Sequence, residues 1–142
     1  MSVTPEFEAA PFETLVDPGL GMVFGFAWAS HVGNLLERHP NAALVADAGD
    51  IQDYALRETF GFCGHAARAT FRYQLDALIA IEITWQLTDD MAGNQRIADA
   101  TMRWFGAALE ELDDGYYGLQ SDTTRLTLDL VDQRLLLEDA EL

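Results

Sequence analysis

The chain has 142 residues, of which 24 are acidic and 8 basic, and its formal net charge is −16. A field this negative repels polyanions, so we expect no direct binding of nucleic acid. One cysteine excludes an internal disulfide, while a hydrophobic fraction of 49% is enough to fold a core.

The sequence shows no signal for export or for a membrane. A signal peptide needs a basic segment before its apolar core, yet the first basic residue is Arg38. The longest stretch without Asp, Glu, Lys or Arg, residues 18–36, just reaches the length of a transmembrane helix. It includes polar residues and four glycines and has no basic flanks, so we expect a cytoplasmic protein with no membrane segment.

Residues 21–29 fit two structures. Alternation gives a strand with one bulky and one small face, whereas small residues four apart fit a closely packed helix. We favour the strand, because two interior glycines cost a soluble helix about 1 kcal/mol each. A short helix over residues 31–39, capped by Ser30 and closed by Pro40, follows from that choice.

A second helix is predicted over residues 51–62, because Asp50 is a good N-cap and Asp53 suits the first turn. The next two segments, 67–75 and 79–87, alternate strictly between apolar and polar residues. Their short join predicts an antiparallel hairpin with one apolar and one polar face.

Arg72 and Glu82 both lie on the polar face of this hairpin, so we expect them to be near neighbours across it. The C-terminal third opens with a long helix predicted from about residue 89 to 112, where apolar positions follow helical spacing, and Gly115 is its expected stop. Strands are expected at 116–120, 124–130 and 134–138.

These elements predict an α+β fold: a mostly antiparallel sheet, with the long helix (about 89–112) and one or two shorter helices packed on its apolar face. Residues 1–13 contain three glutamates and two prolines without periodicity and are expected to be a loose acidic tail. The remaining residues, 14–142, form a single domain. One alternating strand should be an exposed edge, which leaves a homodimer open as the oligomeric state.

No motif assigns a catalytic residue, a metal site or a cofactor. Cys63 and His65 are two residues apart, but the expected role of this lone cysteine is structural. His31 and His39 are eight residues apart and have no other ligand at metal-binding spacing.

The strongest candidate for function is an acidic patch at the expected end of the long helix, where the helix dipole disfavours carboxylates. Helix stability therefore does not explain the patch, and tyrosines, which are common in interfaces, follow it directly. The candidate partner-binding residues are Glu110, Glu111, Asp113, Asp114, Tyr116 and Tyr117.

The charge favours a small interaction protein that neutralises or escorts a basic protein partner, such as an immunity protein, an inhibitor or a nucleic-acid mimic. Two alternatives remain open. The aromatic residues of 22–28 and of the hairpin could line a pocket, as in a small ligand-binding domain or an enzyme. The acidic surface could instead reflect a salt-adapted proteome.

Overall fold

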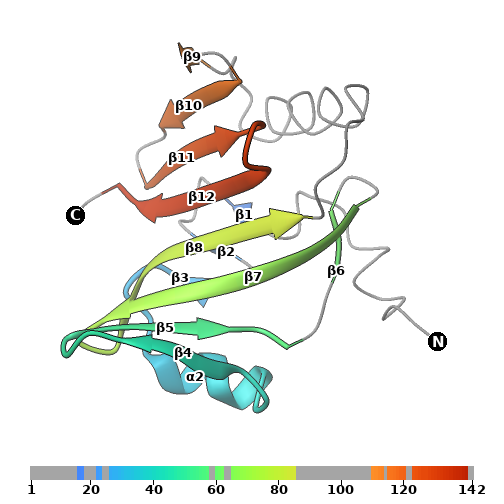
Figure 1. Cartoon of the computed structure of the whole chain (residues 1–142). Coiled ribbons are helices and arrows are strands. Elements are labelled where there is room, and N and C mark those ends of the chain that lie inside the picture. Colours follow the sequence, from blue (N-terminus) through green and yellow to red (C-terminus); the bar gives the residue numbers. More distant parts are fainter. Residues whose placement is uncertain are drawn as a thin grey trace.

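A computed structural model describes residues 16–17, 22–23, 26–57, 60–62, 65–85, 110–113, 115–120 and 123–140. Most of these lie in antiparallel strands (Figure 1). In chain order the elements are β1 (Val16–Asp17), β2 (Met22–Val23), β3 (Phe26–Ala27), α2 (Val32–Arg38), β4 (Ala43–Asp47), β5 (Ile51–Ala55), β6 (Phe60–Phe62), β7 (His65–Gln74), β8 (Ala77–Trp85), β9 (Glu110–Asp113), β10 (Tyr116–Gln120), β11 (Thr124–Asp129) and β12 (Arg134–Asp139).

The strands form one large and one small sheet. The large sheet has nine described strands in the order β4-β5-β7-β8-β12-β11-β10-β9, with β6 paired to β7. The small sheet has the order β1-β2-β3. Among the described strands, β4 and β9 are therefore the two edges of the large sheet, and they lie at its opposite ends (Figure 1).

The hairpin predicted from the strict alternation is confirmed as β7 and β8. Its turn residues, Leu75 and Asp76, both have positive φ (50° and 66°), as a two-residue type I′ turn requires. The register shifts beside the turn, so that Leu78 is fully buried where the alternation placed Ile79. This register shift is a β-bulge, a local irregularity of the pairing that a period-two sequence pattern does not reveal.

The core lies on the apolar face of the large sheet, against α2 and β3. Phe26 of β3 contacts the ring of Phe71 edge-on, with 5.7 Å between centroids, and Leu35 of α2 is fully buried. Trp28 donates a hydrogen bond from Nε1 to Thr124 Oγ1 at 3.0 Å, which ties the chain after β3 to β11. Residues that are far apart in the sequence therefore cover the apolar face of the large sheet together.

The helix predicted over residues 51–62 is wrong, since this segment contains β5 and β6. Its expected start is a hairpin turn instead: Gly49 has φ +90°, and Asp47 Oδ1 accepts a hydrogen bond from Gly49 N at 3.1 Å. Asp and Gly serve both in helix starts and in turns. Pairing with β7 selects the strand, with Tyr54 opposite Phe71.

The long helix predicted over 89–112 is also wrong at its end, because residues 110–112 belong to β9. Residues 89–109 lie outside the described part of the chain. Gly115, the expected helix stop, has φ +75° in the β9–β10 turn, where Asp113 pairs with Tyr116. Asp-Gly between two strands is a strong hairpin signal, which the helical interpretation overlooked.

The expected fold of a sheet covered by a long helix and further helices must therefore be corrected. The described residues are mostly antiparallel sheet, with one short helix, α2, among them. Within this part of the chain, no helix has the length and apolarity needed to cross a membrane. The expected tail, residues 1–13, lies outside the described residues.

Other predicted elements are confirmed. Residues 21–29 contain strand, as we favoured, but as two short strands, β2 and β3, that pair antiparallel with each other and not as one continuous strand. The short helix of 31–39 is α2, although His31, rather than Ser30, caps it by accepting a hydrogen bond from Gly33 N. The three C-terminal strands are β10, β11 and β12.

The hydroxyl of Tyr73 gives a first testable prediction. This side chain is fully buried, and its Oη has no hydrogen-bond partner among the described residues. An unsatisfied buried hydroxyl is costly, so Tyr73→Phe should raise the free energy of unfolding by about 1 kcal/mol. Urea unfolding at pH 7 measures this change. A loss of stability would contradict the assignment of this hydroxyl as buried and without a hydrogen-bond partner among the described residues.

The Tyr73 hydroxyl also leads us to expect that the free energy of unfolding depends on pH. Burial, with a smaller contribution from Tyr54, raises the pKa of Tyr73. Below about pH 10, the usual value, Tyr73 is protonated in the folded and unfolded chain, so its contribution is fully present. Above that pH the unfolded chain loses its proton first, and stability falls. Tyr73→Phe should remove that part of the alkaline loss, as unfolding midpoints from pH 8 to 11 would show.

Candidate protein-binding site at the acidic edge of the sheet

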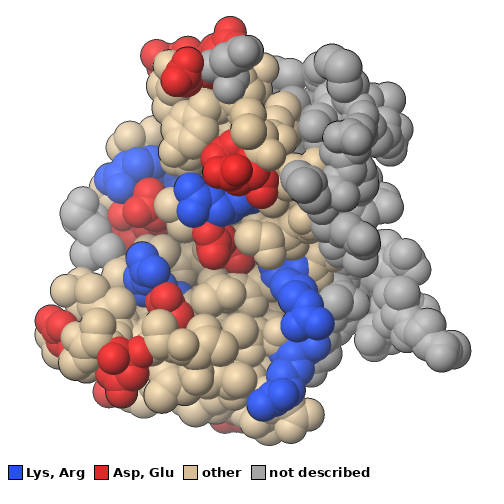
Figure 2. Space-filling model, viewed as in Figure 1, with Lys and Arg blue, Asp and Glu red and all other residues tan. Residues whose placement is uncertain are grey.

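Three of the predicted partner-binding residues lie together on the edge strand β9. All four residues of β9 are exposed, so Glu110, Glu111 and Asp113 present their carboxylates to solvent. Figure 2 shows acidic side chains grouped at the top of the view, where Figure 1 places β9. A fourth predicted residue, Asp114, lies outside the described part of the chain.

The two predicted tyrosines point to opposite faces of β10, because successive side chains of a strand alternate. Tyr116 pairs with Asp113 on one side and with Asp129 on the other. Tyr117 is partly buried and packs against the hydrophobic core. The structure therefore places both tyrosines beside β9, with Tyr117 opposite Glu111, but the ring of Tyr117 packs against the core.

A hollow of about 480 Å³ lies beside β9, and its lining joins this strand to the β11–β12 turn. The lining residues are Leu112, Asp113, Tyr116, Asp129, Val131 and Asp132. Leu112 and Val131 are unusually exposed for aliphatic side chains, at 55% and 67%. The hollow thus combines carboxylates with apolar surface.

Sequence reasoning missed the contribution of the β11–β12 turn to this site. Asp129 and Asp132 are sixteen or more residues from β9, and only the pairing of β10 with β11 brings them alongside. The alternation of residues 124–130 predicted a strand there, which is part of the information needed to find this site. An antiparallel hairpin with 116–120 places Asp129 opposite Tyr116.

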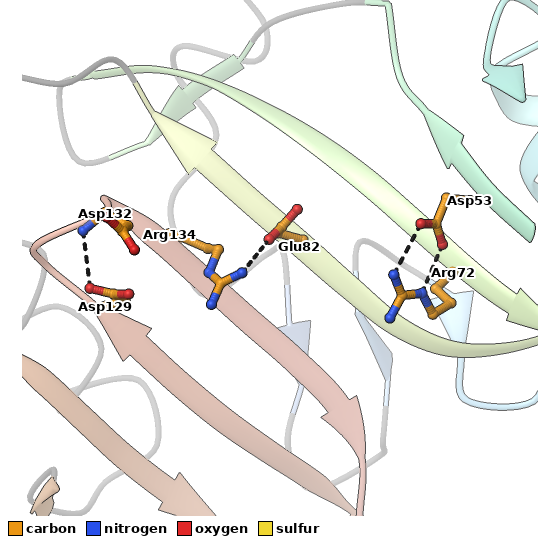
Figure 3. A network of polar contacts seen from close by, with 6 residues as sticks. All are labelled: Asp53, Arg72, Glu82, Asp129, Asp132 and Arg134. Carbon is orange, nitrogen blue, oxygen red and sulfur yellow. Dashed lines mark hydrogen bonds and ion pairs between the residues drawn. The ribbon is translucent and has the colours of Figure 1, made fainter. Parts of the chain in front are cut away.

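Hydrogen bonds hold this turn in place (Figure 3). Asp129 is 6% exposed, and its Oδ1 accepts from the backbone N of Val131 and of Asp132, each at 3.0 Å. Leu130 N donates to Gly115 O at 2.8 Å, which ties the β11–β12 turn to the β9–β10 turn. Hydrogen bonds within the chain therefore fix this wall of the hollow without a bound partner.

Charges at the centre of the polar face are paired with one another. Arg72 forms two hydrogen bonds with Asp53, at 2.8 and 3.0 Å, and Arg134 contacts Glu82 at 3.1 Å (Figure 3). The hydrogen bond that Arg72 donates to Asp53 raises the pKa of Arg72. Arg72 therefore takes Asp53 as its ion-pair partner, and Glu82, expected beside it, pairs with Arg134.

The carboxylates of Glu110 and Glu111 on β9 differ from these central carboxylates. No ion pair involves Glu110, Glu111 or Asp132 within the residues that the structure describes. No group of three His, Cys, Asp or Glu among these residues could hold a metal ion. The arrangement suits an organic cation, since an arginine or lysine can rest its stem on apolar surface and direct its charge to carboxylates.

The other chemistry-bearing residues do not gather into a site. Cys63 lies outside the described residues, and His65 is the first residue of β7. His31 caps α2 through Nδ1, and His39 follows the helix, with its ring 6.5 Å from that of Phe26. The two histidines therefore lie at the two ends of α2, His31 as its N-cap and His39 as its C-cap.

Comparison with known proteins adds no relative. No protein-family model matches the chain, and neither a curated protein nor a solved structure matches it significantly.

Proposed function

We propose that this protein is a small acidic interaction protein that binds a basic protein partner at the edge formed by β9 and the β11–β12 turn, and so neutralises or escorts it. An immunity protein, an inhibitor or a nucleic-acid mimic would work in this way. The observation that carries the proposal is the hollow beside β9, whose apolar and acidic walls adjoin the exposed carboxylates of Glu110 and Glu111, which form no ion pair within the described residues.

The edge position favours a partner segment in extended conformation. Among the described strands, β9 pairs only with β10, so its outer side is not joined to another strand. An extended peptide can add to such an edge through its main chain, while its side chains give specificity. Basic side chains alternating along that peptide would meet the carboxylates of β9 and the adjoining hollow.

The net charge of −16 supports the same conclusion at longer range. A strongly negative protein attracts a basic partner before contact and raises the association rate. Salt screens this attraction, because the Debye length falls from about 10 Å at 0.1 M to about 3 Å at 1 M. Binding should therefore weaken as the salt concentration rises.

A short peptide of alternating arginine and valine is a suitable probe, and calorimetry measures its affinity. The double variant E110Q/E111Q should bind the peptide about tenfold more weakly than the wild type, a loss of about 1.4 kcal/mol. The matched control is E37Q/D76N, which removes the same charge from exposed positions outside the edge. This control should retain nearly full affinity.

Three results would argue against the proposal. Equal losses in the two double variants would mean that the peptide responds only to overall charge. Binding that persists undiminished at about 0.5 M salt would exclude an electrostatic origin. Unchanged binding with increased aggregation of E110Q/E111Q would mean that the glutamates only protect the edge from pairing. Melting temperatures of both variants verify that they remain folded.

A further inference from the structure

The opposite edge of the large sheet, β4, has the reverse character. Among the described strands it pairs only with β5, and its side chains from Leu44 to Asp47 are all exposed. Leu44 is 50% exposed and Val45 is 59% exposed. Val45 also has no Cα partner on β5, because the register shifts between Leu44 and Ala46. Apolar side chains are therefore open on both faces of this strand.

Most of this strand lacks the charged side chains that usually protect an edge. Exposed edges normally have charged side chains that prevent pairing with another chain. Residues 40–46 contain no Asp, Glu, Lys or Arg, although the whole chain has 32 such residues. For a chain of charge −16, contact with its own copy is least opposed where the surface has no charge. Of the two edges, β4 satisfies this condition and β9 does not.

The two ends of β4 have opposite charges. At the N-terminal end, Arg57 Nε donates to Asn41 O at 2.8 Å, and this exposed arginine has no carboxylate partner among the described residues. At the C-terminal end, Asp47 and Asp50 are exposed. A two-fold axis through the middle of β4 would set the N-terminal end of one copy beside the C-terminal end of the other. Arg57 of each copy would then face Asp50 of the other.

The apolar side chains fit the same arrangement. Leu44 is opposite Tyr54, which packs against the hydrophobic core, so Leu44 lies on the core-side face of the sheet. Antiparallel pairing of two β4 strands would set both copies of Leu44 on the same side of the extended sheet and continue the apolar layer across the seam. We propose that this protein forms a two-fold homodimer by antiparallel pairing of β4. The inference does not depend on the function proposed for β9.

Analytical ultracentrifugation of the full chain tests the dimer. The wild type should sediment as a dimer, and Val45→Lys should raise the dissociation constant at least about tenfold by adding a charge to the seam. The matched control is Leu112→Lys, which places the same charge on the exposed position of the other edge, and it should remain dimeric. Circular dichroism verifies that both variants are folded.

A charge exchange tests the orientation and does not depend on Val45→Lys folding. Arg57→Asp and Asp50→Arg should each weaken the dimer, and the double variant R57D/D50R should restore it, because each pair of opposite charges is then formed again. A wild type that stays monomeric up to about 1 mM would overturn the proposal. So would a dimer that Leu112→Lys dissociates as readily as Val45→Lys, or one that the charge exchange does not restore.

Discussion

Replacing Phe71 by alanine should lower the free energy of unfolding by about 3–5 kcal/mol. The side chain is fully buried in β7, near the middle of the large sheet, and contacts Phe26 on the covering layer edge-on. Its removal loses the burial of an aromatic ring and leaves a cavity that the sheet cannot close. Domains are typically stable by about 5–15 kcal/mol, so much of the fold's stability depends on this residue.

Urea unfolding, followed by tryptophan fluorescence, measures this loss. The control is Thr84→Ala on β8, an exposed residue of the polar face, which should change stability by less than about 0.5 kcal/mol. Equal effects of the two substitutions would contradict the assignment of the apolar face. If Phe71→Ala does not fold, Phe71→Leu provides a measurable, smaller loss.

Asp129→Ala should cost about 2–3 kcal/mol, because two backbone N–H groups would lose their charged acceptor in a nearly buried turn. Asp129→Asn keeps an acceptor oxygen and should cost less. The turn forms one wall of the hollow beside β9, so Asp129→Ala should also weaken binding of the arginine–valine peptide.

Asp132→Ala is the matched control for this effect on stability. Asp132 lies in the same turn and is exposed, and the bond to Asp129 comes from its backbone N, which the substitution keeps. Its unfolding free energy should stay within about 0.5 kcal/mol of the wild type. A loss as large as that of Asp129→Ala would show that charge in the turn, rather than the hydrogen bonds, sets its stability.

The two edges of the large sheet, β9 and β4, differ in their charge. The edge strand β9 has exposed carboxylates, whereas β4 has no charged residue from Ala43 to Ala46, with Arg57 near its N-terminal end and Asp47 at its C-terminal end. The proposals for these edges can therefore fail independently. Loss of peptide binding in E110Q/E111Q leaves the dimer intact, and dissociation by Val45→Lys leaves the peptide site intact.

Period-two alternation was the most reliable signal in the sequence. It identified β7, β8 and β11, because one face of each strand is buried against the core and the other is less buried. The wrong helix start at Asp50 and the wrong helix end at Gly115 depended on single residues instead. Asp50 and Gly115 were interpreted as a helix cap and a helix stop, yet both belong to hairpin turns, where the same residue types are favoured.

The sequence by itself determined the charge, the alternating strands and the acidic residues of 110–113 as the candidate contact. Only the tertiary structure decided that these residues form an edge strand, that Tyr117 packs against the core, and that Asp129 and Asp132 complete the site. The physical reason is that alternation is a local property of a strand. Strand order and register depend on contacts between residues far apart in the chain, which local patterns do not specify.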